Sequence, residues 1–412
     1  MTVRPCRFCG AQLEHTFCDL GMSPLSNAFL TVEQLQFMEP HYPLHAYVCD
    51  SCFLVQLQEI ETPQHIFGED YVYFSSYSQT WLDHARAYAD RMVERFGYGP
   101  ASLVVEIASN DGYLLQYFKQ KNVPVLGIEP AEKCALVSKQ AGIPTVVQFF
   151  GTALASELKA QGKTADLLVG NNVLAHVPAL NDFVHGLKIL LKPSGLITME
   201  FPHLLKLIRE NQFDTIYHEH YSYFSLYTVE KVFARQGLKL FDVERLPTHG
   251  GSLRIYAAHA EDASKALTKH VTYLRDEETR SGIADLQTYR AFAEQVKRTK
   301  RKLLEFLIQA KEAGKTIVAY GAPAKGNTLL NYCGVRTDFI DYAVDRSPYK
   351  QGRFLPGTRI PVFHPDRIRD TRPDYVLVLP WNIKDEVMSQ MAHVKKWNAQ
   401  FVIPIPEVQV LP

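Results

Sequence analysis

The chain lacks an excess of charge of either sign, because its 412 residues include 44 lysines and arginines against 44 aspartates and glutamates. No overall electrostatic field therefore draws it to nucleic acid or to an anionic membrane. It also lacks any apolar run near the roughly 20 residues that a membrane span needs. Its start, MTVRPCRFCG, lacks the apolar stretch of a signal peptide. We expect a cytoplasmic protein that binds neither nucleic acid nor membrane.

Cysteine is scarce as well, and an odd total of seven cannot pair completely in disulfides. Two Cys-x-x-Cys pairs favour metal binding in a reducing compartment, and they comprise Cys6, Cys9, Cys49 and Cys52. Four thiolates complete a tetrahedral zinc site with no open position, so we expect a structural zinc ion. Buried free thiols and a metal-free redox pair are the alternatives. The long separation between the pairs predicts an inserted loop.

Internal repeats and low-complexity tracts are absent too, and the chain is too long for a single hydrophobic core. Strand and helix patterns alternate in two series, the first from residue 103 and the second from residue 315. Each series predicts an open α/β unit, and the first has the pattern of a parallel, doubly wound sheet. A long amphipathic helix over 286–314 lies between them. We place domain boundaries near residues 70 and 245, which divides the chain into 1–70, 71–245 and a smaller α/β unit, 246–412.

The stretch VVEIASNDGYL, residues 104–114, is similar to the strand-to-helix turn of class I methyltransferases. In that turn an acidic residue precedes a glycine-rich loop that approaches S-adenosylmethionine. Asn110, Asp111 and Gly112 stand at the loop, and only the last is a glycine, although Asn and Asp tolerate left-handed backbone. Glu129 ends the next strand, where a carboxylate can accept both ribose hydroxyls.

An NAD site competes with this interpretation, and a turn without a ligand is a third possibility. The G-x-G-x-x-G fingerprint of a pyrophosphate site is missing. Glu106, beside the loop, suits the cationic methionine moiety of S-adenosylmethionine better than it suits phosphates. The turn therefore favours S-adenosylmethionine as the cofactor.

The segment GNNVLAHVP, residues 170–178, follows a central strand. Asn171 and Asn172 lie at the carboxyl end of that strand, where open α/β sheets bind ligands. His176 lies one turn further on. A lone histidine is more often a core or surface residue than a catalyst, but this one is next to the predicted cofactor site.

The segment IYHEHYSYF, residues 216–224, admits three interpretations: a metal site, an acid–base site or a polar strand end. In an extended strand His218 and His220 would share one face and Glu219 would point the other way. If the backbone is irregular, Glu219 and His220 can converge on one substrate. The segment by itself leaves these alternatives open.

Taken together, the motifs resemble those of the sugar C-methyltransferases of deoxysugar biosynthesis, which methylate nucleotide-linked 4-keto sugars. The resemblance covers essentially the whole chain, and its motifs are CRFC, CDSC, DYVYFSSYSQTWLDHA, IASNDGYLL, GNNVLAHVP, YHEHYSYFS, HGGSLRIY and AYGAPAKGNTLLN. It implies a zinc-binding N-terminal unit, a Rossmann-like methyltransferase domain and a C-terminal α/β domain that binds the nucleotide. It also implies that the sugar pocket is lined by Tyr71, Asn172, His176, Tyr217, Glu219 and His220.

This resemblance favours acid–base chemistry for the histidine segment. A ketone at C4 acidifies the C3 and C5 protons, and a base within hydrogen-bond reach can remove one of them. We predict that His220 is the base, that Glu219 orients it, and that Tyr217 and Tyr71 donate hydrogen bonds to the ketone or ring hydroxyls. Because adjacent residues cannot share a face of a regular strand, we also predict an irregular backbone at Glu219 and His220.

In the C-terminal part, TIVAYGAPAKGNTLL, residues 316–330, reads as a strand, a turn and a helix start. Backbone N–H groups there can hold a diphosphate, and the resemblance makes this half the nucleotide site. The candidate substrate ligands are Arg254, Lys325, Asn327, Lys350 and Arg353. A packing turn with solvated charges is the alternative.

The activity that these observations predict is C3 methylation of a nucleotide-diphosphate 4-keto-6-deoxy sugar by S-adenosylmethionine. The same chemistry at C5, an NAD-dependent oxidoreductase or epimerase, and a zinc-containing binding protein with a dead site are the alternatives. The sequence favours neither a monomer nor a homo-oligomer.

Overall fold

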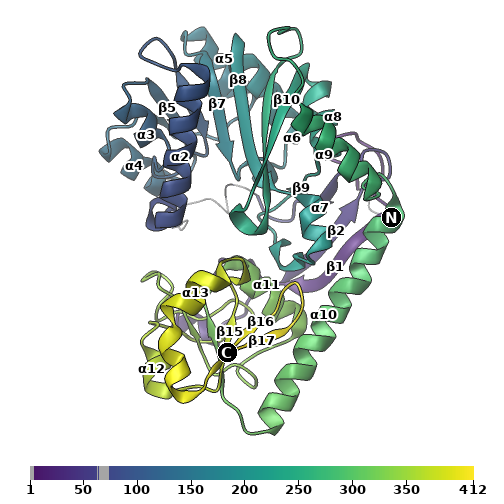
Figure 1. The fold of residues 1–412 in the computed structure, drawn as a ribbon, viewed down its shortest axis with the longest axis vertical. Helices are drawn as coiled ribbons and strands as arrows, with labels where there is room; N and C mark the ends of the chain where they lie inside the picture. The colour runs from purple at the N-terminus through teal and green to yellow at the C-terminus, as the bar shows by residue number, and fades with distance from the viewer. Residues whose placement is uncertain (1–3, 63, 65–73) are drawn as a thin grey trace.

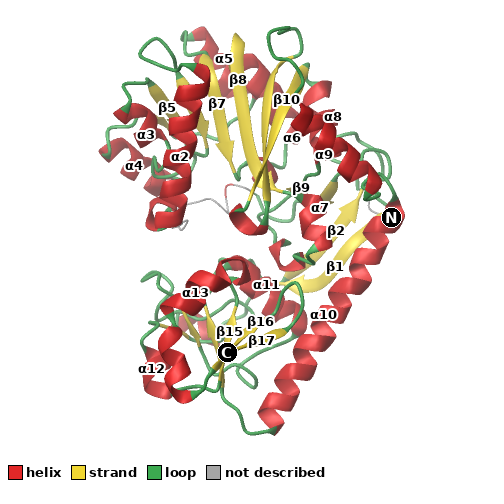
Figure 2. Ribbon diagram, in the orientation of Figure 1, coloured by secondary structure: helices red, strands yellow, loops and turns green. Residues whose placement is uncertain are grey.

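The computed structural model describes residues 4–62, 64 and 74–412. It contains three sheets (Figures 1 and 2). Two α/β units lie one above the other, and the long helix α10 (Leu286–Glu312) runs down beside β1 and the lower unit. Within the described residues no helix combines the length and the apolar character required to cross a membrane.

The smallest sheet belongs mainly to the N-terminal unit. It has the order β1-β2-β3-β9, with β1 at His15–Ser23, β2 at Tyr42–Val48 and β3 at Val55–Leu57. Its last strand, β9 (Ser222–Tyr223), comes from the histidine-rich segment and pairs antiparallel with β3. This pairing fixes that segment against the N-terminal unit.

The central sheet has seven strands in the order β10-β11-β8-β7-β4-β5-β6. Buried, apolar strands form its middle, because both faces are covered by helices. Its strands are β4 (Val104–Ile107), β5 (Val125–Ile128), β6 (Thr145–Val146), β7 (Ala165–Asn171), β8 (Leu191–Pro202), β10 (Leu238–Leu246) and β11 (Ser252–His259). Only β11 is antiparallel to its neighbours, β8 and β10. The predicted parallel α/β unit is confirmed, with one reversed strand.

Eight helices of this unit lie within the described residues: α2 (Gln79–Phe96), α3 (Leu115–Gln120), α4 (Glu132–Gln140), α5 (Thr152–Ala160), α6 (Leu180–Leu190), α7 (Leu204–Arg209), α8 (Leu226–Arg235) and α9 (Lys269–Arg280). Apolar side chains at helical spacing pack them onto the sheet. Helix α2 ends with Gly97 in the left-handed conformation, at φ 70°, a common way for helices to stop.

The boundary predicted near residue 245 does not coincide with the end of this sheet. It falls inside β10, and the next strand, β11, lies between β8 and β10. Helix α9 also packs on β10. A strand pattern alone does not reveal which sheet the strand joins, because alternation specifies the buried face and not the neighbour.

The C-terminal sheet has the order β14-β13-β12-β15-β16-β17, with only β17 antiparallel. Its strands are β12 (Ile317–Tyr320), β13 (Ala343–Val344), β14 (Val362–Phe363), β15 (Tyr375–Val378), β16 (Gln400–Ile403) and β17 (Gln409–Leu411). Its helices are α11 (Ala324–Cys333), α12 (Arg367–Thr371) and α13 (Lys384–Gln390). The second predicted α/β unit is confirmed. Gly314, the last residue of the helix predicted over 286–314, lies just after α10 and has φ 68°, a left-handed conformation that is common where helices end.

The insert between the cysteine pairs contacts the C-terminal unit. Leu30 forms an antiparallel bridge with Phe354, and the Glu39 carboxylate accepts a 2.6 Å hydrogen bond from the Gly357 N–H. The loop predicted from the cysteine spacing thus carries β1 and then a segment that joins the first and last parts of the chain.

Candidate functional site

The four paired cysteines form one cluster in which all sulfur atoms lie within 4.8 Å of one another. The sulfurs of Cys6 and Cys52 are 3.6 Å apart, and those of Cys9 and Cys49 are 3.5 Å apart. A tetrahedron with zinc–sulfur bonds of about 2.3 Å has edges of about 3.8 Å, so the cluster fits zinc. The Gln56 amide donates to Cys6 Sγ. Four thiolates leave no position for substrate, and the zinc is structural.

The turn after β4 has the left-handed backbone positions that are typical of a glycine-rich loop, although few of its residues are glycines. Ala108 has φ 58°, Asn110 has φ 50° and Gly112 has φ 82°. Asn110 thus adopts the left-handed conformation that the sequence argument required. A Cβ on Gly112 would approach Ile143 Cδ1 to 2.4 Å, so glycine is needed for space as well as for conformation.

Glu129, at the end of β5, accepts hydrogen bonds from the Asn110 N–H at 2.9 Å and the Ala131 N–H at 2.8 Å. Burial raises its pKa to about 7, although these bonds lower it. Glu106 is fully buried at the same turn, and burial raises its pKa well above the ordinary value, with the charges of Asp111 and Glu129 adding. A cationic ligand suits these acidic groups, because a nearby positive charge would favour the ionised form of both buried carboxyl groups.

A short segment from another part of the chain lies over this turn. The Ser75 N–H donates to Asn110 Oδ1 at 2.9 Å, and the Ser76 N–H donates to Asp111 Oδ2 at 3.1 Å. Asn110 and Asp111, which were both predicted as cofactor ligands, therefore hold this covering segment in place. Tyr71, the remaining predicted pocket residue of the same motif, lies outside the described residues.

Asn171 and Asn172 lie at the carboxyl end of β7 as predicted. Asn171 Nδ2 donates to the Tyr113 hydroxyl at 3.1 Å, next to the first turn. Asn172 has φ 54°, which is uncommon outside glycine and is found at functional sites. His176 follows in a 3-10 turn, Leu174–His176, and burial lowers its pKa to about 4.

The histidine-rich segment has the predicted irregular backbone, because residues 216–221 belong to no strand and the His220 N–H bonds the Tyr217 carbonyl in a turn. His220 Nδ1 lies 2.9 Å from the Thr215 carbonyl and Nε2 lies 2.9 Å from the Tyr217 hydroxyl. Nδ1 must carry the hydrogen, since a carbonyl only accepts, and Nε2 of the neutral ring then accepts from Tyr217. The ring packs against His176 at 4.7 Å between centroids.

Burial lowers the pKa of His220 well below its ordinary value, and the charges of His176 and Lys325 act in the same direction. The imidazole is therefore neutral at pH 7, with a lone pair on Nε2. A neutral, oriented imidazole is the form that can accept a proton.

The neighbours of His220 have other roles than predicted. Glu219 is buried and accepts a 2.6 Å hydrogen bond from Asn27 of the N-terminal insert, so it does not orient the imidazole; the Thr215 carbonyl does. His218 is buried and packs edge-on against Tyr42, with 5.9 Å between ring centroids. It faces the N-terminal sheet, away from His220, and the pair does not form a metal site.

The C-terminal turn supplies cations to the same region. Lys325 Nζ donates to Asn382 Oδ1 at 2.7 Å and lies 4.5 Å from the centre of the Trp381 ring. Its charge acts on His220, His249 and the buried Asp214. Trp381 Nε1 donates to Asp214 Oδ2 at 2.7 Å. Lys325 therefore faces the histidine cluster from across the interface between the two α/β units.

The other predicted cations and amides of the C-terminal part differ in position. Lys350 Nζ donates to the Ala322 carbonyl at 2.9 Å and lies 3.6 Å from Asp345, at the carboxyl ends of the strands. Arg353 is exposed in the following turn. Asn327 is 1% exposed and donates to the Ser26 carbonyl. It ties the N-terminal insert to α11, and its prediction as a substrate ligand is wrong.

Arg254 is also not a substrate ligand. Its side chain is fully buried in β11 and bonds Glu200 at 2.6 Å and Glu244 at 3.2 Å, above the ring of Tyr88. Two carboxylates already neutralise it, and no anion can reach it. Burial alone would raise the pKa of Glu200, but the hydrogen bond to His84 and the Arg254 charge lower it to about 2.

Three residues of the candidate site, Thr215, Trp381 and His249, were not predicted from the sequence. The Thr215 carbonyl carries no side-chain signal, because any residue offers the same acceptor. Trp381 follows β15, and the carboxyl end of a parallel strand is a position that could have suggested it. His249 belongs to the motif HGGSLRIY, in which no specific role was predicted for this histidine.

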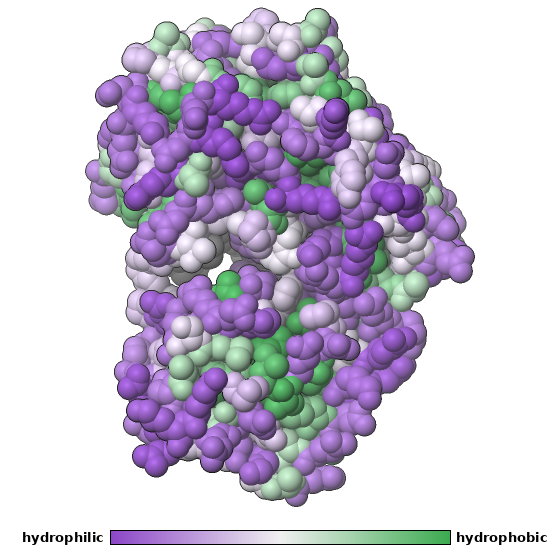
Figure 3. All heavy atoms as spheres, in the orientation of Figure 1, coloured by the Kyte–Doolittle hydropathy of each residue, from purple (hydrophilic) through white to green (hydrophobic). Residues whose placement is uncertain are grey.

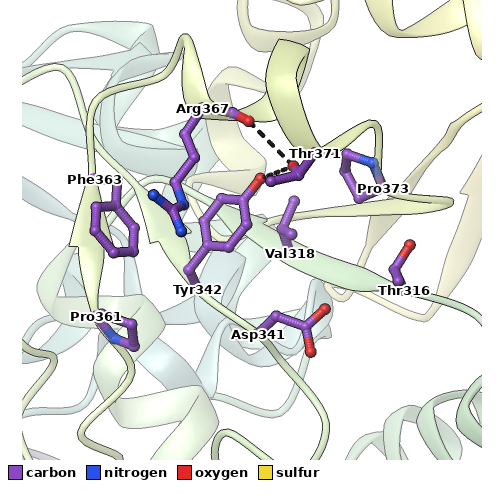
Figure 4. A pocket seen from close by; sticks show the side chains of 9 residues that line it. All are labelled: Thr316, Val318, Asp341, Tyr342, Pro361, Phe363, Arg367, Thr371 and Pro373. Atoms are coloured by element: carbon purple, nitrogen blue, oxygen red, sulfur yellow. Dashed lines mark hydrogen bonds between the residues drawn. The ribbon is translucent and has the colours of Figure 1, made fainter.

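A cavity of about 330 Å³ lies elsewhere in the C-terminal unit. Figure 4 shows Arg367 beside the rings of Tyr342 and Phe363, and Tyr342 bonded to Thr371. Other lining residues precede strands, such as Thr316 before β12 and Pro373 before β15. Open α/β sheets bind ligands at the carboxyl ends of their strands, so this cavity is not part of the candidate site.

Figure 3 shows a hollow between the upper and lower units. The acidic first turn belongs to the central unit, and Lys325 of the C-terminal unit acts through its charge on His220 and His249. This arrangement can hold a cationic cofactor on the acidic side, an anionic ligand on the basic side, and a proton acceptor between them.

Comparison with known proteins finds three family models along the chain. Family models match residues 6–67 as a zinc binding domain, residues 81–243 as a methyltransferase domain and residues 247–406 as a C-methyltransferase C-terminal domain. The chain is 36% identical to the C-methyltransferase NovU of Streptomyces niveus over 412 residues, which covers 99% of this chain and 98% of that protein.

Two solved structures match in part. Magnesium protoporphyrin IX methyltransferase of Synechocystis PCC 6803 is 16% identical, with 48% of this chain and 88% of that chain covered and a TM-score of 0.34. The 1,6-didemethyltoxoflavin N1-methyltransferase of Burkholderia thailandensis is 15% identical, with 50% and 95% covered and a TM-score of 0.37. By the match along its whole length and by its three domains, the chain belongs to the family of S-adenosylmethionine-dependent C-methyltransferases with a zinc-binding N-terminal unit.

Proposed function

We propose that the protein transfers a methyl group to C3 of a nucleotide-diphosphate 4-keto-6-deoxy sugar. The observation that carries this proposal is the His220 imidazole. It is neutral, it is oriented by the Thr215 carbonyl and the Tyr217 hydroxyl, and it lies between an acidic turn and a basic one. Methylation of carbon needs a carbanion, and removal of a proton next to a ketone provides one.

On the cofactor side, Glu129 would hold the ribose hydroxyls, and Glu106 and Asp111 would face the cationic end of the cofactor. When bound, S-adenosylmethionine supplies an electrophilic methyl group. The turn orients it, because positioning of two reactants can account for much of the rate enhancement. The cover formed by Ser75 and Ser76 would exclude water from this end.

On the sugar side, we infer that the diphosphate lies near the first turn of α11 and Lys350, where backbone N–H groups and an ammonium group attract phosphate. The sugar then extends towards His220. The C3 proton passes to the Tyr217 oxygen while the Tyr217 proton passes to His220 Nε2. The neutral state of His220 at pH 7 makes this possible, since a protonated ring could not accept it.

The test uses thymidine-, uridine-, guanosine- and cytidine-diphosphate 4-keto-6-deoxyhexoses in deuterated water. With S-adenosylhomocysteine present, the wild-type protein should exchange one sugar proton for deuterium at C3, measured by NMR. With S-adenosylmethionine it should place the methyl group on the same carbon. Exchange at C5 instead of C3 would assign the methylation to the carbon on the other side of the ketone. The absence of exchange with all four sugars would refute the proposed substrate class.

A further inference from the structure

His249 lies in the 3-10 turn Thr248–Gly250, with φ 55° and ψ 25°. This left-handed conformation is uncommon for a residue with a side chain, and such strain is concentrated at functional sites. Gly250 and Gly251 follow with φ 89° and 119°. Gly250 also packs closely on Trp381, since an added Cβ would lie 2.8 Å from that ring. The turn is thus held in one conformation from the C-terminal side.

The surroundings of His249 place it beside the reaction site. Its side chain is exposed, yet the Trp81 ring meets it edge-on at 5.2 Å between centroids. The charges of Lys325, Glu200 and His84 act on it, and it acts in turn on His176 and His220. His249 is thus open to solvent and close enough to His176 and His220 for their charges to interact, which places it next to the proposed reaction site.

The proposed reaction needs a group of this kind. When a proton leaves C3, negative charge develops on the C4 oxygen, and a donor aimed at that oxygen usually contributes much of the catalysis. The Tyr217 hydroxyl is bonded to His220 Nε2, and the Thr215 carbonyl can only accept. The donor for the oxygen must therefore come from another residue.

A neutral imidazole is a suitable donor. The protein groups packed against the ring and the Lys325 charge lower the pKa of His249, and even an unshifted histidine is mostly uncharged at pH 7, so the ring has one N–H to donate. Neutral histidine polarises a carbonyl in this way in other enolising enzymes. Lys325 adds positive charge on the same side.

We propose that His249 is a further catalytic residue, which donates a hydrogen bond to the C4 oxygen of the sugar while the enolate forms. The inference rests on the proposed function, because it requires an enolisable ketone. The C3–H bond breaks, and its electron pair becomes the C3–C4 double bond as the carbonyl pair moves onto oxygen. The proton passes through Tyr217 to His220 Nε2. His249 keeps its proton throughout.

The test compares His249→Gly, which removes the donor and accepts the left-handed backbone, with His249→Asn. Asparagine also tolerates that backbone and retains an N–H donor. Arg372→Gly is the matched control, because Arg372 is an exposed left-handed residue at the end of α12. Deuterium exchange into the sugar is measured with S-adenosylhomocysteine present, together with kcat, KM and the thermal midpoint.

We expect His249→Gly to lower the exchange rate and kcat by about 100-fold or more, the range for loss of one such donor, with KM and the midpoint little changed. His249→Asn should recover most of the rate, and Arg372→Gly should match the wild type. Exchange in His249→Gly within about threefold of wild type would overturn the inference. So would an asparagine variant no better than the glycine variant, or an effect confined to KM. No exchange in the wild type would instead refute the proposed function.

Discussion

The two α/β units share one local arrangement at their first turns. In the central unit Glu129 ends the second strand and accepts from the Asn110 N–H of the first turn and from the Ala131 N–H two residues on. In the C-terminal unit Asp345 follows β13 and accepts from the Ala322 N–H at 2.7 Å and from the Ser347 N–H at 2.8 Å. Each acid joins the ends of two neighbouring parallel strands.

The charges around the two turns are opposite. Glu106 and Asp111 surround the first acid, whereas Lys350 pairs with Asp345 and Lys325 begins the following helix. One scaffold therefore offers an acidic turn for a cation and a basic turn for an anion. The same backbone arrangement therefore presents opposite charges, because the side chains around the two turns differ.

We expect the largest effect from replacing His220, the proposed base between the acidic and the basic turn. His220→Asn should lower proton exchange and methylation by about 10²- to 10⁴-fold, the usual contribution of a positioned base. Both ligands should still bind, because each turn is intact; calorimetry checks this. His218→Asn is the control, since His218 faces the N-terminal sheet. Full activity in the His220 variant would remove it from the mechanism.

Zinc loss tests whether the metal stabilises the N-terminal unit, which lies outside both turns. Cys49→Ser should lower bound zinc from about one equivalent and reduce the free energy of unfolding by about 3 kcal/mol or more, as expected for loss of a structural metal. Metal analysis and denaturant titration measure both. Cys333→Ser, at a buried cysteine outside the cluster, is the control and should retain the metal. Zinc content equal to wild type in Cys49→Ser would refute the assignment.

Glu129→Gln should weaken S-adenosylhomocysteine binding by about 1–3 kcal/mol, the range for hydrogen bonds to a charged group. The Asn110 and Ala131 N–H groups donate to different oxygens of Glu129, so glutamine, with one acceptor oxygen, keeps one of these two bonds and replaces the other acceptor by a donor. The affinity for the sugar nucleotide should stay the same. A variant that loses only sugar-nucleotide affinity would reverse the assignment of the two turns.

Asp345→Asn should have the complementary and smaller effect. It should weaken the nucleotide-diphosphate sugar by about 0.5–1.5 kcal/mol, because the changed hydrogen bonds only position the turn, and leave S-adenosylhomocysteine affinity unchanged. Titration calorimetry with each ligand compares the two variants directly. Loss of cofactor affinity in this variant would mean that the two turns do not act separately.

The pH dependence gives the smallest expected effect. The pKa of Glu129 is raised from 4.5 to about 7, so the ligand-free fold loses stability as pH rises from about 4.5 through 7. Ribose hydroxyls bond best to an ionised carboxylate, so cofactor affinity should instead rise by a few-fold between pH 6 and 8. Glu129→Gln should abolish that rise. An unchanged slope in the variant would assign it to another group.

Much of the scaffold could be predicted from local patterns. The cysteine pairs, the buried strands of both units, the helix before Gly314 and the acid at Glu129 each depend on residues close together in the chain. The irregular backbone at His220 was predicted on the premise that Glu219 and His220 converge; the backbone is irregular, but Glu219 bonds Asn27 instead. These features depend on spacing, and spacing is visible in a sequence.

The errors have a different origin. Arg254 was predicted as a substrate ligand, but β11 pairs with β8 and β10 and brings Glu200 and Glu244 to it. Glu219 looked like the partner of the adjacent histidine, but the insert brings Asn27 to it. In both cases the partner lies far along the chain or on a neighbouring strand whose register no local pattern specifies.

The sequence by itself indicated the three-part organisation, the thiolate set for zinc and the acidic first turn, and it singled out His220, which we propose as the base. Only the tertiary structure decided that Thr215 and Tyr217 set the proton positions on that histidine, that Lys325 and His249 face it from two sides, and that Asn327 is a tether. The physical reason is that burial and hydrogen-bond partners determine the charge state and orientation of a side chain. Both depend on contacts between distant segments.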